Sequence, residues 1–161
     1  MALDKKLSHI SKDGNPAMVD VSQKRISDRK AKARAVVGLG AEIISHLNDG
    51  EISTRKGPVF QTAIIAGTMA AKKTGELIPL CHPLGLDSCE FEIKVFHNDV
   101  IIYCTAGVNA KTGVEMEALT GASLAALTIY DMCKAMSHDI VIKEIKLMEK
   151  TGGKNDFKRE E

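Results

Sequence analysis

The sequence of 161 residues contains no tryptophan, and aromatic residues make up only 4% of it. It also lacks a charge excess, because 22 lysines and arginines face 21 aspartates and glutamates, for a formal net charge of +1. So small a net charge gives no long-range attraction to nucleic acid or to an anionic membrane. Any anion that this chain binds therefore has to be held by a local cluster of basic side chains.

The sequence also lacks an apolar run long enough to span a bilayer, and charges interrupt residues 1–16 where a signal peptide would be apolar. These features predict a cytoplasmic protein without membrane contact. No Cys-x-x-Cys pair occurs, and the cysteines stand singly at Cys81, Cys89, Cys104 and Cys133. In a reducing compartment they are expected to be small buried side chains rather than disulfide partners.

Hydrophobic periodicity predicts one domain of the α+β class. Strands are predicted over 30–37, 88–96, 100–108 and 139–148, and helices over 40–49, 58–74 and 114–136. This order favours a ferredoxin-like fold, a largely antiparallel sheet with helices packed on one face. The predicted division is a flexible N-terminal arm at 1–17, a single catalytic domain at 18–150 and a polar C-terminal tail at 151–161.

The helix predicted over 114–136 is rich in alanine, leucine and methionine and carries little charge along its middle. A helix of this composition is typically buried nearly all round. One domain of this length with few aromatic residues has little surplus core to cover it. Part of the helix is therefore expected to bury against another subunit.

Residues 76–84, ELIPLCHPL, place Cys81 beside His82 in a loop stiffened by Pro79 and Pro83. Adjacent residues make poor ligands for one zinc ion, and the other histidines share no ligand spacing, so no metal site is predicted. Cys81 is expected to pack as a small side chain. His82 either serves proton transfer or phosphate binding, for which a stiff loop suits it, or belongs to a loop that only connects.

Carboxylates cluster at the predicted start of the longest helix. The helix dipole alone favours Glu115 and Glu117 there. In the functional alternative, Glu115, Met116 and Glu117 border a pocket in which carboxylates pair with the N–H edge of a guanine-like ring. The later stretch TGGK, residues 151–154, lacks the first glycine and the strand–loop–helix setting of a phosphate loop. No nucleotide signature is assigned to it.

Asp131 and Lys134 stand three residues apart, which places them on one face of the same helix. An exposed salt bridge is the ordinary interpretation of such a pair. Its apolar setting, ALTIYDMCKAM, suggests instead a buried lysine whose pKa desolvation lowers, although the aspartate opposes that shift. Lys56 precedes another predicted helix, and residues 29–32 contain three basic side chains for binding an anion.

Seven stretches together resemble the cyclic pyranopterin monophosphate synthases of molybdenum cofactor biosynthesis: MVDVS, KGPVF, AAKKT, LIPLCHPL, KTGVEMEALT, LTIYDMCKAM and EKTGGK. The resemblance runs in order from Met18 to Lys154. It implies a ferredoxin-like lyase without a cofactor, which converts cyclic 7,8-dihydroguanosine triphosphate to cyclic pyranopterin monophosphate and releases pyrophosphate. It also implies a homohexamer, a trimer of dimers, with active sites between subunits.

The resemblance further implies roles for individual residues. The implied catalytic residues are Asp131, Lys134 and Lys56. The implied substrate-binding residues are Leu80, Cys81, His82, Glu115, Met116, Glu117 and Arg29, with Lys72 and Lys73 as neighbouring candidates for phosphate binding. In this hypothesis Lys56 and Lys134 transfer protons, while Asp131 orients Lys134.

The chain departs from the family pattern at Ala110, at Ile64 and at Asn155–Asp156, and none of these replaces an implied catalytic residue. Two other function classes remain as alternatives. A non-catalytic oligomeric nucleotide-binding module would bind without turnover and tolerate Asp131→Asn. A zinc-dependent hydrolase would contain stoichiometric metal and lose activity with a chelator.

Overall fold

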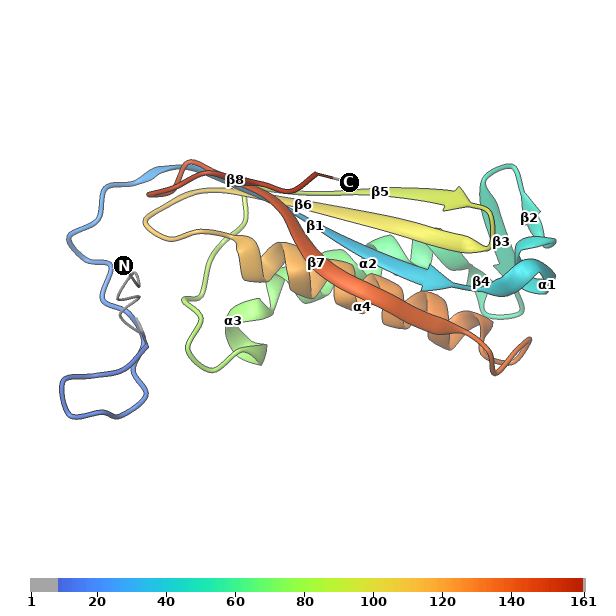
Figure 1. Ribbon diagram of the computed structural model, residues 1–161, viewed down its shortest axis with the longest axis horizontal. Helices are drawn as coiled ribbons and strands as arrows, with labels where there is room; N and C mark the ends of the chain where they lie inside the picture. The colour runs from blue at the N-terminus through green and yellow to red at the C-terminus, as the bar shows by residue number, and fades with distance from the viewer. Residues whose placement is uncertain (1–8, 161) are drawn as a thin grey trace.

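The computed structural model describes residues 9–160, in which α2 and α4 lie along one side of a long sheet (Figure 1). The strands are β1 (Ser27–Gly38), β2 (Leu47–Asn48), β3 (Glu51–Thr54), β4 (Gly57–Pro58), β5 (Ser88–Phe96), β6 (Asp99–Ala110), β7 (Val141–Thr151) and β8 (Phe157–Lys158). The helices are α1 (Gly40–Ile44), α2 (Val59–Lys72), α3 (Thr74–Leu77) and α4 (Glu115–Cys133).

The main sheet has five strands in the order β5-β6-β1-β7-β8, and every neighbouring pair is antiparallel. The predicted α+β class with an antiparallel sheet is confirmed. The long elements follow the chain as β1-α2-β5-β6-α4-β7, which is consistent with the ferredoxin-like arrangement. A second, small sheet pairs β2, β3 and β4 beyond the end of the main sheet (Figure 1).

Small side chains form the centre of the core. Ala31, Ala33 and Ala35 alternate along β1 toward the helices, and each is no more than 2% exposed. The basic residues between them lie on the opposite face, as the period of two requires. α4 packs across β1, β6 and β7 and buries a row of its own alanines there, including Ala122 and Ala126. Alanine on both elements allows the helix to lie close to the sheet.

α2 and α4 touch each other through glycine. A Cβ atom added to Gly67 would lie 2.5 Å from the Phe91 ring and 2.8 Å from the carbonyl oxygen of Gly121. A backbone carbonyl in a packed helix has little room to move, so the two helices can approach this closely only without a side chain here.

Gly67→Ala is therefore expected to destabilise the protein by about 1–3 kcal/mol, because overpacking outweighs the helix propensity of alanine. Urea unfolding at fixed protein concentration measures the change. The matched control is Gly85→Ala, since an added Cβ at Gly85 meets nothing within 4 Å. Equal midpoints for the two variants would contradict the close-packing argument.

Two predicted segments differ in the structure. The helix predicted over 40–49 ends at Ile44, and β2 then pairs with β3 through a hairpin. Asp49 and Gly50 both have positive φ angles, of 49° and 77°, as a two-residue hairpin turn needs. The Asp-Gly pair is thus the turn of a hairpin, and the predicted continuation of the helix to residue 49 was wrong. In the polar tail, β8 pairs with β7 and extends the sheet.

No helix among residues 9–160 is both long enough and apolar enough to cross a membrane.

Candidate functional site

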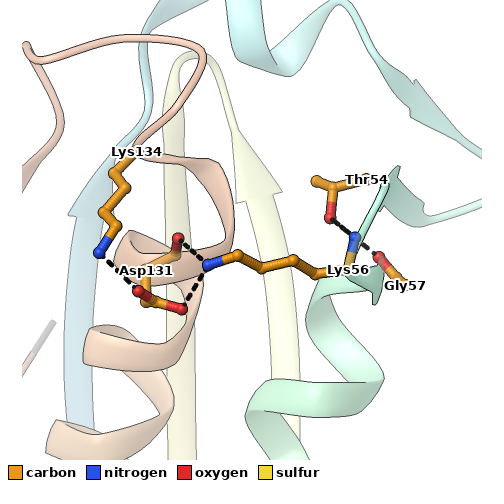
Figure 2. Close-up of polar contacts among 5 residues, drawn as sticks. All are labelled: Thr54, Lys56, Gly57, Asp131 and Lys134. Carbon is orange, nitrogen blue, oxygen red and sulfur yellow. Dashed lines mark hydrogen bonds and ion pairs between the residues drawn. The ribbon is translucent and has the colours of Figure 1, made fainter.

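Three charged residues meet at the end of α4 (Figure 2). The Lys134 Nζ lies 2.7 Å from Asp131 Oδ1, and the Lys56 Nζ lies 2.8 Å from Asp131 Oδ2. Lys56 also donates to the main-chain oxygen of Asp131 at 3.2 Å. Asp131 and Lys134 come from the last turn and the C-terminal cap of α4, whereas Lys56 comes from the turn between β3 and β4. One carboxylate therefore holds two ammonium groups from distant parts of the sequence.

The two lysines stabilise the Asp131 carboxylate. Hydrogen bonds from Lys134 and then Lys56, followed by their charges, lower the pKa of Asp131 to about 2 from its usual 3.8. The bond to Asp131 raises the pKa of Lys134 in turn. The apolar sequence around Lys134 suggested that this lysine is buried and has a lowered pKa. In the single chain that suggestion was wrong. The Lys134 side chain is 56% exposed, so desolvation is weaker than the attraction of the aspartate.

A second cluster surrounds a basic cavity of about 400 Å³ at the start of α4. Its basic lining residues are His9, Lys24, Arg29, Lys30, His82, Lys150 and Lys154. Glu115 is the one carboxylate among the described residues that line it, and its Oε1 lies 3.0 Å from the Lys150 Nζ. The Arg29 Nε is buried and has no hydrogen-bond partner in the described part of the chain. This cavity can hold a polyanion such as a phosphate chain.

A smaller cavity of about 280 Å³ adjoins the basic one, and the two share His82 and Glu115 among their linings. Its other lining residues include Leu80, Cys81, Met116 and Glu117. The structure thus brings the predicted residues of the 76–84 loop and of the start of α4 to the smaller cavity, and Arg29 lines the basic cavity beside it. Apolar side chains with two carboxylates suit a flat, nitrogen-rich ring.

His82 connects the loop to the N-terminal segment. Its Nε2 donates to the main-chain oxygen of Val19 at 2.7 Å, because a carbonyl can only accept. Cys81, beside it, is partly buried, and burial raises the pKa of its thiol, with a smaller contribution from Glu117. A thiol in this state is a weak nucleophile, as expected for a packing role.

Glu117 is only 3% exposed. Burial raises its pKa, and the charge of Glu115 adds to the effect. A folded-state pKa above the unfolded one means that the folded chain binds the proton more tightly. The protein therefore loses stability as pH rises through the folded-state pKa of Glu117.

Glu117→Gln is expected to raise the urea midpoint at pH 8 by more than at pH 5, because glutamine carries no buried charge at either pH. Glu76→Gln on the exposed surface of α3 is the control, for which the two differences should be small and similar. If Glu117→Gln gave the same shift at both pH values, the carboxylate would not be destabilised by its burial.

Lys72 and Lys73 are exposed at the end of α2 and line neither of these cavities. Lys72 borders a separate hollow with Asp87. Sequence reasoning missed Lys24 and Lys150, and it set aside TGGK, although Gly153 and Lys154 line the basic cavity. The sequence signal that could have identified this part of the site is the glycine pair at 152–153, which permits a tight turn, rather than a phosphate-loop pattern.

Gly152 has a φ of +79°, and a Cβ there would collide with the main-chain oxygen of Asp28. The glycine lets the end of β7 turn closely over the start of β1, which places Lys154 beside Arg29 at the cavity.

The two clusters lie at opposite ends of α4. At 1.5 Å per residue, this helix of 19 residues is about 28 Å long, with Glu115 at its start and Asp131 near its end. A single chain therefore does not bring the catalytic and substrate-binding candidates together. Within residues 9–160, no group of three or more His, Cys, Asp or Glu side chains is arranged to hold a metal ion.

Comparison with known proteins gives one consistent result. The family model described as the MoaC family matches residues 18–153. A cyclic pyranopterin monophosphate synthase of Xanthomonas campestris pv. campestris strain B100 is 51% identical over 153 residues, which covers 94% of this chain and 93% of that protein.

Two longer proteins are similar over the same region. A molybdenum cofactor biosynthesis bifunctional protein of Synechocystis is 52% identical, and molybdenum cofactor biosynthesis protein 1 of Dictyostelium discoideum is 49% identical. Each match covers 92% of this chain. The chain spans 44% of the first relative and 26% of the second.

Proposed function

The chain belongs to the MoaC family, and from this we propose that it is a cyclic pyranopterin monophosphate synthase. In this proposal it converts cyclic 7,8-dihydroguanosine triphosphate to cyclic pyranopterin monophosphate and releases pyrophosphate, as an early step of molybdenum cofactor biosynthesis. The observation that carries the proposal is the basic cavity joined to a hollow with two carboxylates. That pair suits a substrate with a triphosphate at one end and a guanine-derived ring at the other.

Each cluster has a part in this proposal. Arg29, Lys150 and Lys154 hold phosphate oxygens, with His82 beside them, and Glu115 and Glu117 bind the ring edge. Lys56 and Lys134 transfer protons while the ring opens and closes again, and Asp131 holds both lysines at one place. No step in this assignment needs a redox cofactor.

The active site in this proposal lies between two copies of the chain, because one helix keeps the two clusters apart. The end of α4 from one copy would meet the cavities at the start of α4 in another. Covering the lysines in this way removes water, which favours the neutral amine that a base requires.

Exposed apolar residues on the helix layer support self-association. Ile65 and Met69 on α2 are 62% and 55% exposed, and Leu127 on α4 is 50% exposed. Residues of this kind on two neighbouring helices are typical of a surface that another subunit covers. The proposed assembly is a homohexamer, a trimer of dimers.

The proposed compartment is the cytoplasm. All four cysteines are free thiols, including Cys89 and Cys104, whose sulfur atoms lie 4.0 Å apart. Unpaired cysteines at such a distance suit a reducing environment.

Release of pyrophosphate from freshly prepared cyclic 7,8-dihydroguanosine triphosphate tests the proposed function directly. Purified protein is expected to release one pyrophosphate for each substrate molecule consumed and to form the cyclic monophosphate. Tight binding without release would replace the synthase with a nucleotide-binding regulator.

A further inference from the structure

Lys56 stands in a two-residue turn between β3 and β4. Thr54 and Gly57 pair across this turn, and Arg55 and Lys56 form its tip. The small sheet that contains the turn lies beyond the end of the main sheet (Figure 1). The position of Lys56 therefore depends on local contacts rather than on the central core.

The Thr54 hydroxyl bonds the tip of this turn and its second arm (Figure 2). Its Oγ1 accepts the main-chain N–H of Lys56 at 3.1 Å and donates to the carbonyl oxygen of Gly57 at 3.3 Å. Gly57 has a φ of +113°, which side-chain-bearing residues rarely adopt. Glycine adopts such a φ readily, so Gly57 permits the turn and the Thr54 hydroxyl holds it in this shape.

The Lys56 side chain has few other restraints. It is 53% exposed, and the bonds found for its Nζ among the described residues both go to Asp131, to Oδ2 at 2.8 Å and to the main-chain oxygen at 3.2 Å. An exposed lysine has many rotamers of similar energy. The direction in which the chain leaves the turn therefore decides whether the ammonium reaches Asp131.

The start of α2, which follows the turn, is fixed by a different residue. The carboxylate of Glu51 accepts the main-chain N–H groups of Phe60 at 2.8 Å and of Gln61 at 3.1 Å. Because Glu51 satisfies these helix donors, α2 does not need Thr54 in order to begin at Val59. Loss of the Thr54 hydroxyl should disturb the turn and leave the helix in place.

We propose that Thr54 is a positioning residue for Lys56: its hydroxyl fixes the turn so that the Lys56 Nζ reaches the Asp131 carboxylate. The kinetic part of this inference rests on the proposed synthase function. The placement of Lys56 does not, and it can be measured without substrate.

The experiment uses full-length protein with Thr54→Val, Thr54→Ser or Thr68→Val. Valine keeps the shape of threonine and removes the hydroxyl, whereas serine keeps the hydroxyl. Thr68→Val is the matched control within α2, where the Thr68 Oγ1 donates to the carbonyl oxygen of Ile64 at 2.8 Å. It makes the same chemical change at a partly buried site away from the turn.

The first readout is acetylation of Lys56 by limiting acetic anhydride, measured by mass spectrometry of peptides. Acetylation requires the neutral amine to approach the reagent, and the bonds to Asp131 hold the Lys56 nitrogen in place, so release of Lys56 from Asp131 makes it react faster. The internal standard is Lys143, another paired lysine, whose Nζ lies 2.7 and 2.8 Å from the Asp99 carboxylate oxygens. Thr54→Val is expected to speed Lys56 acetylation about fivefold relative to Lys143, as loss of one hydrogen bond implies.

The second readout is steady-state pyrophosphate release. Thr54→Val is expected to lower kcat about tenfold, because a displaced lysine no longer meets the reacting atoms. Its KM should change less than about twofold, because Thr54 lines neither cavity that would bind the substrate. Thr54→Ser and Thr68→Val should match wild type in both readouts.

Unchanged Lys56 acetylation in Thr54→Val would overturn the inference, whatever the kinetics show. So would a Thr68→Val variant that lost as much kcat as Thr54→Val. If Lys56 were acetylated faster in Thr54→Val but wild type released no pyrophosphate, the positioning role of Thr54 would stand and the proposed synthase function would be rejected. If Thr54→Val failed to fold, Thr54→Ala would take its place with the same expected results.

Discussion

Replacing Asp131 with asparagine is expected to lower kcat for pyrophosphate release by about 100-fold or more, the usual range for loss of acid–base machinery. Asparagine keeps the shape of aspartate but has no negative charge to hold two ammonium groups. In wild type, the bonds from Lys134 and Lys56 lower the pKa of Asp131 to about 2, so that it stays a carboxylate throughout the neutral range. The variant would leave the two lysines without a shared carboxylate, although the main-chain oxygen of residue 131 would remain an acceptor for Lys56.

The same change should leave folding nearly intact. Asp131 and both lysines are about half exposed, at 52%, 53% and 56%, and ion pairs of that kind contribute little to stability. The urea midpoint of Asp131→Asn is therefore expected to stay close to wild type while activity falls. The matched control is Asp139→Asn, because Asp139 is an exposed aspartate beyond the end of α4. This variant should keep both the urea midpoint and the activity of wild type.

Wild-type turnover by a folded, assembled Asp131→Asn protein would reject the assigned role. Equal ligand binding by wild type and Asp131→Asn, with turnover by neither, would favour the non-catalytic nucleotide-binding alternative, which tolerates this substitution.

Two inactive variants are expected to restore each other when they share an oligomer. Asp131→Asn disables the cluster at the end of α4, and His82→Ala disables the cavities at its start. If one active site takes its halves from two copies, some mixed interfaces contain two intact halves. With random assembly of equal amounts, about a quarter of the sites would be intact, because each half is intact with a probability of one half.

Coexpression of the two chains, followed by purification of the mixed oligomer, allows the measurement. The control is coexpression of Asp131→Asn with Lys56→Ala. Both of these changes affect the same half, so no mixed site is complete and activity should stay near that of either variant alone. Restored activity only in the first pair would support a shared site. No restoration in either pair would place the whole site within one chain.

Much of the fold could be predicted because its patterns are local. The alternation of Cys89, Phe91, Ile93 and Val95 gave a strand with the same bounds, 88–96, as β5. The helix predicted over 114–136 from its apolar composition also agrees closely with α4, Glu115–Cys133. The helix predicted over 40–49 was wrong beyond Ile44, because the apolar residues there suited a helical period as well as the short strands of the hairpin at Asp49–Gly50.

The site was less accessible to sequence reasoning because its contacts are not local. Lys56 and Asp131 lie 75 residues apart, and the packing of α2 against α4 brings the turn that carries Lys56 near the end of α4. The basic cavity collects side chains from several separate segments, so no spacing along the chain predicts Lys24 or Lys150. The exposure of the Lys134 side chain could not be predicted from the sequence either. Because the side chain is exposed in one chain, the bond to Asp131 raises its pKa, whereas burial would lower it.

The length of α4 has a consequence for how activity responds to dilution. In the proposed shared site, each copy carries two unlike half-sites about 24 Å apart along the helix from Glu115 to Asp131, and neither half can complete the other within the same chain. On dilution below the dissociation constant of the interface, a dissociated chain would remain folded and yet contain no complete site. Specific activity would then fall by mass action alone, with no change in the circular dichroism spectrum. Catalysis in such a protein would be a property of its concentration as well as of its fold.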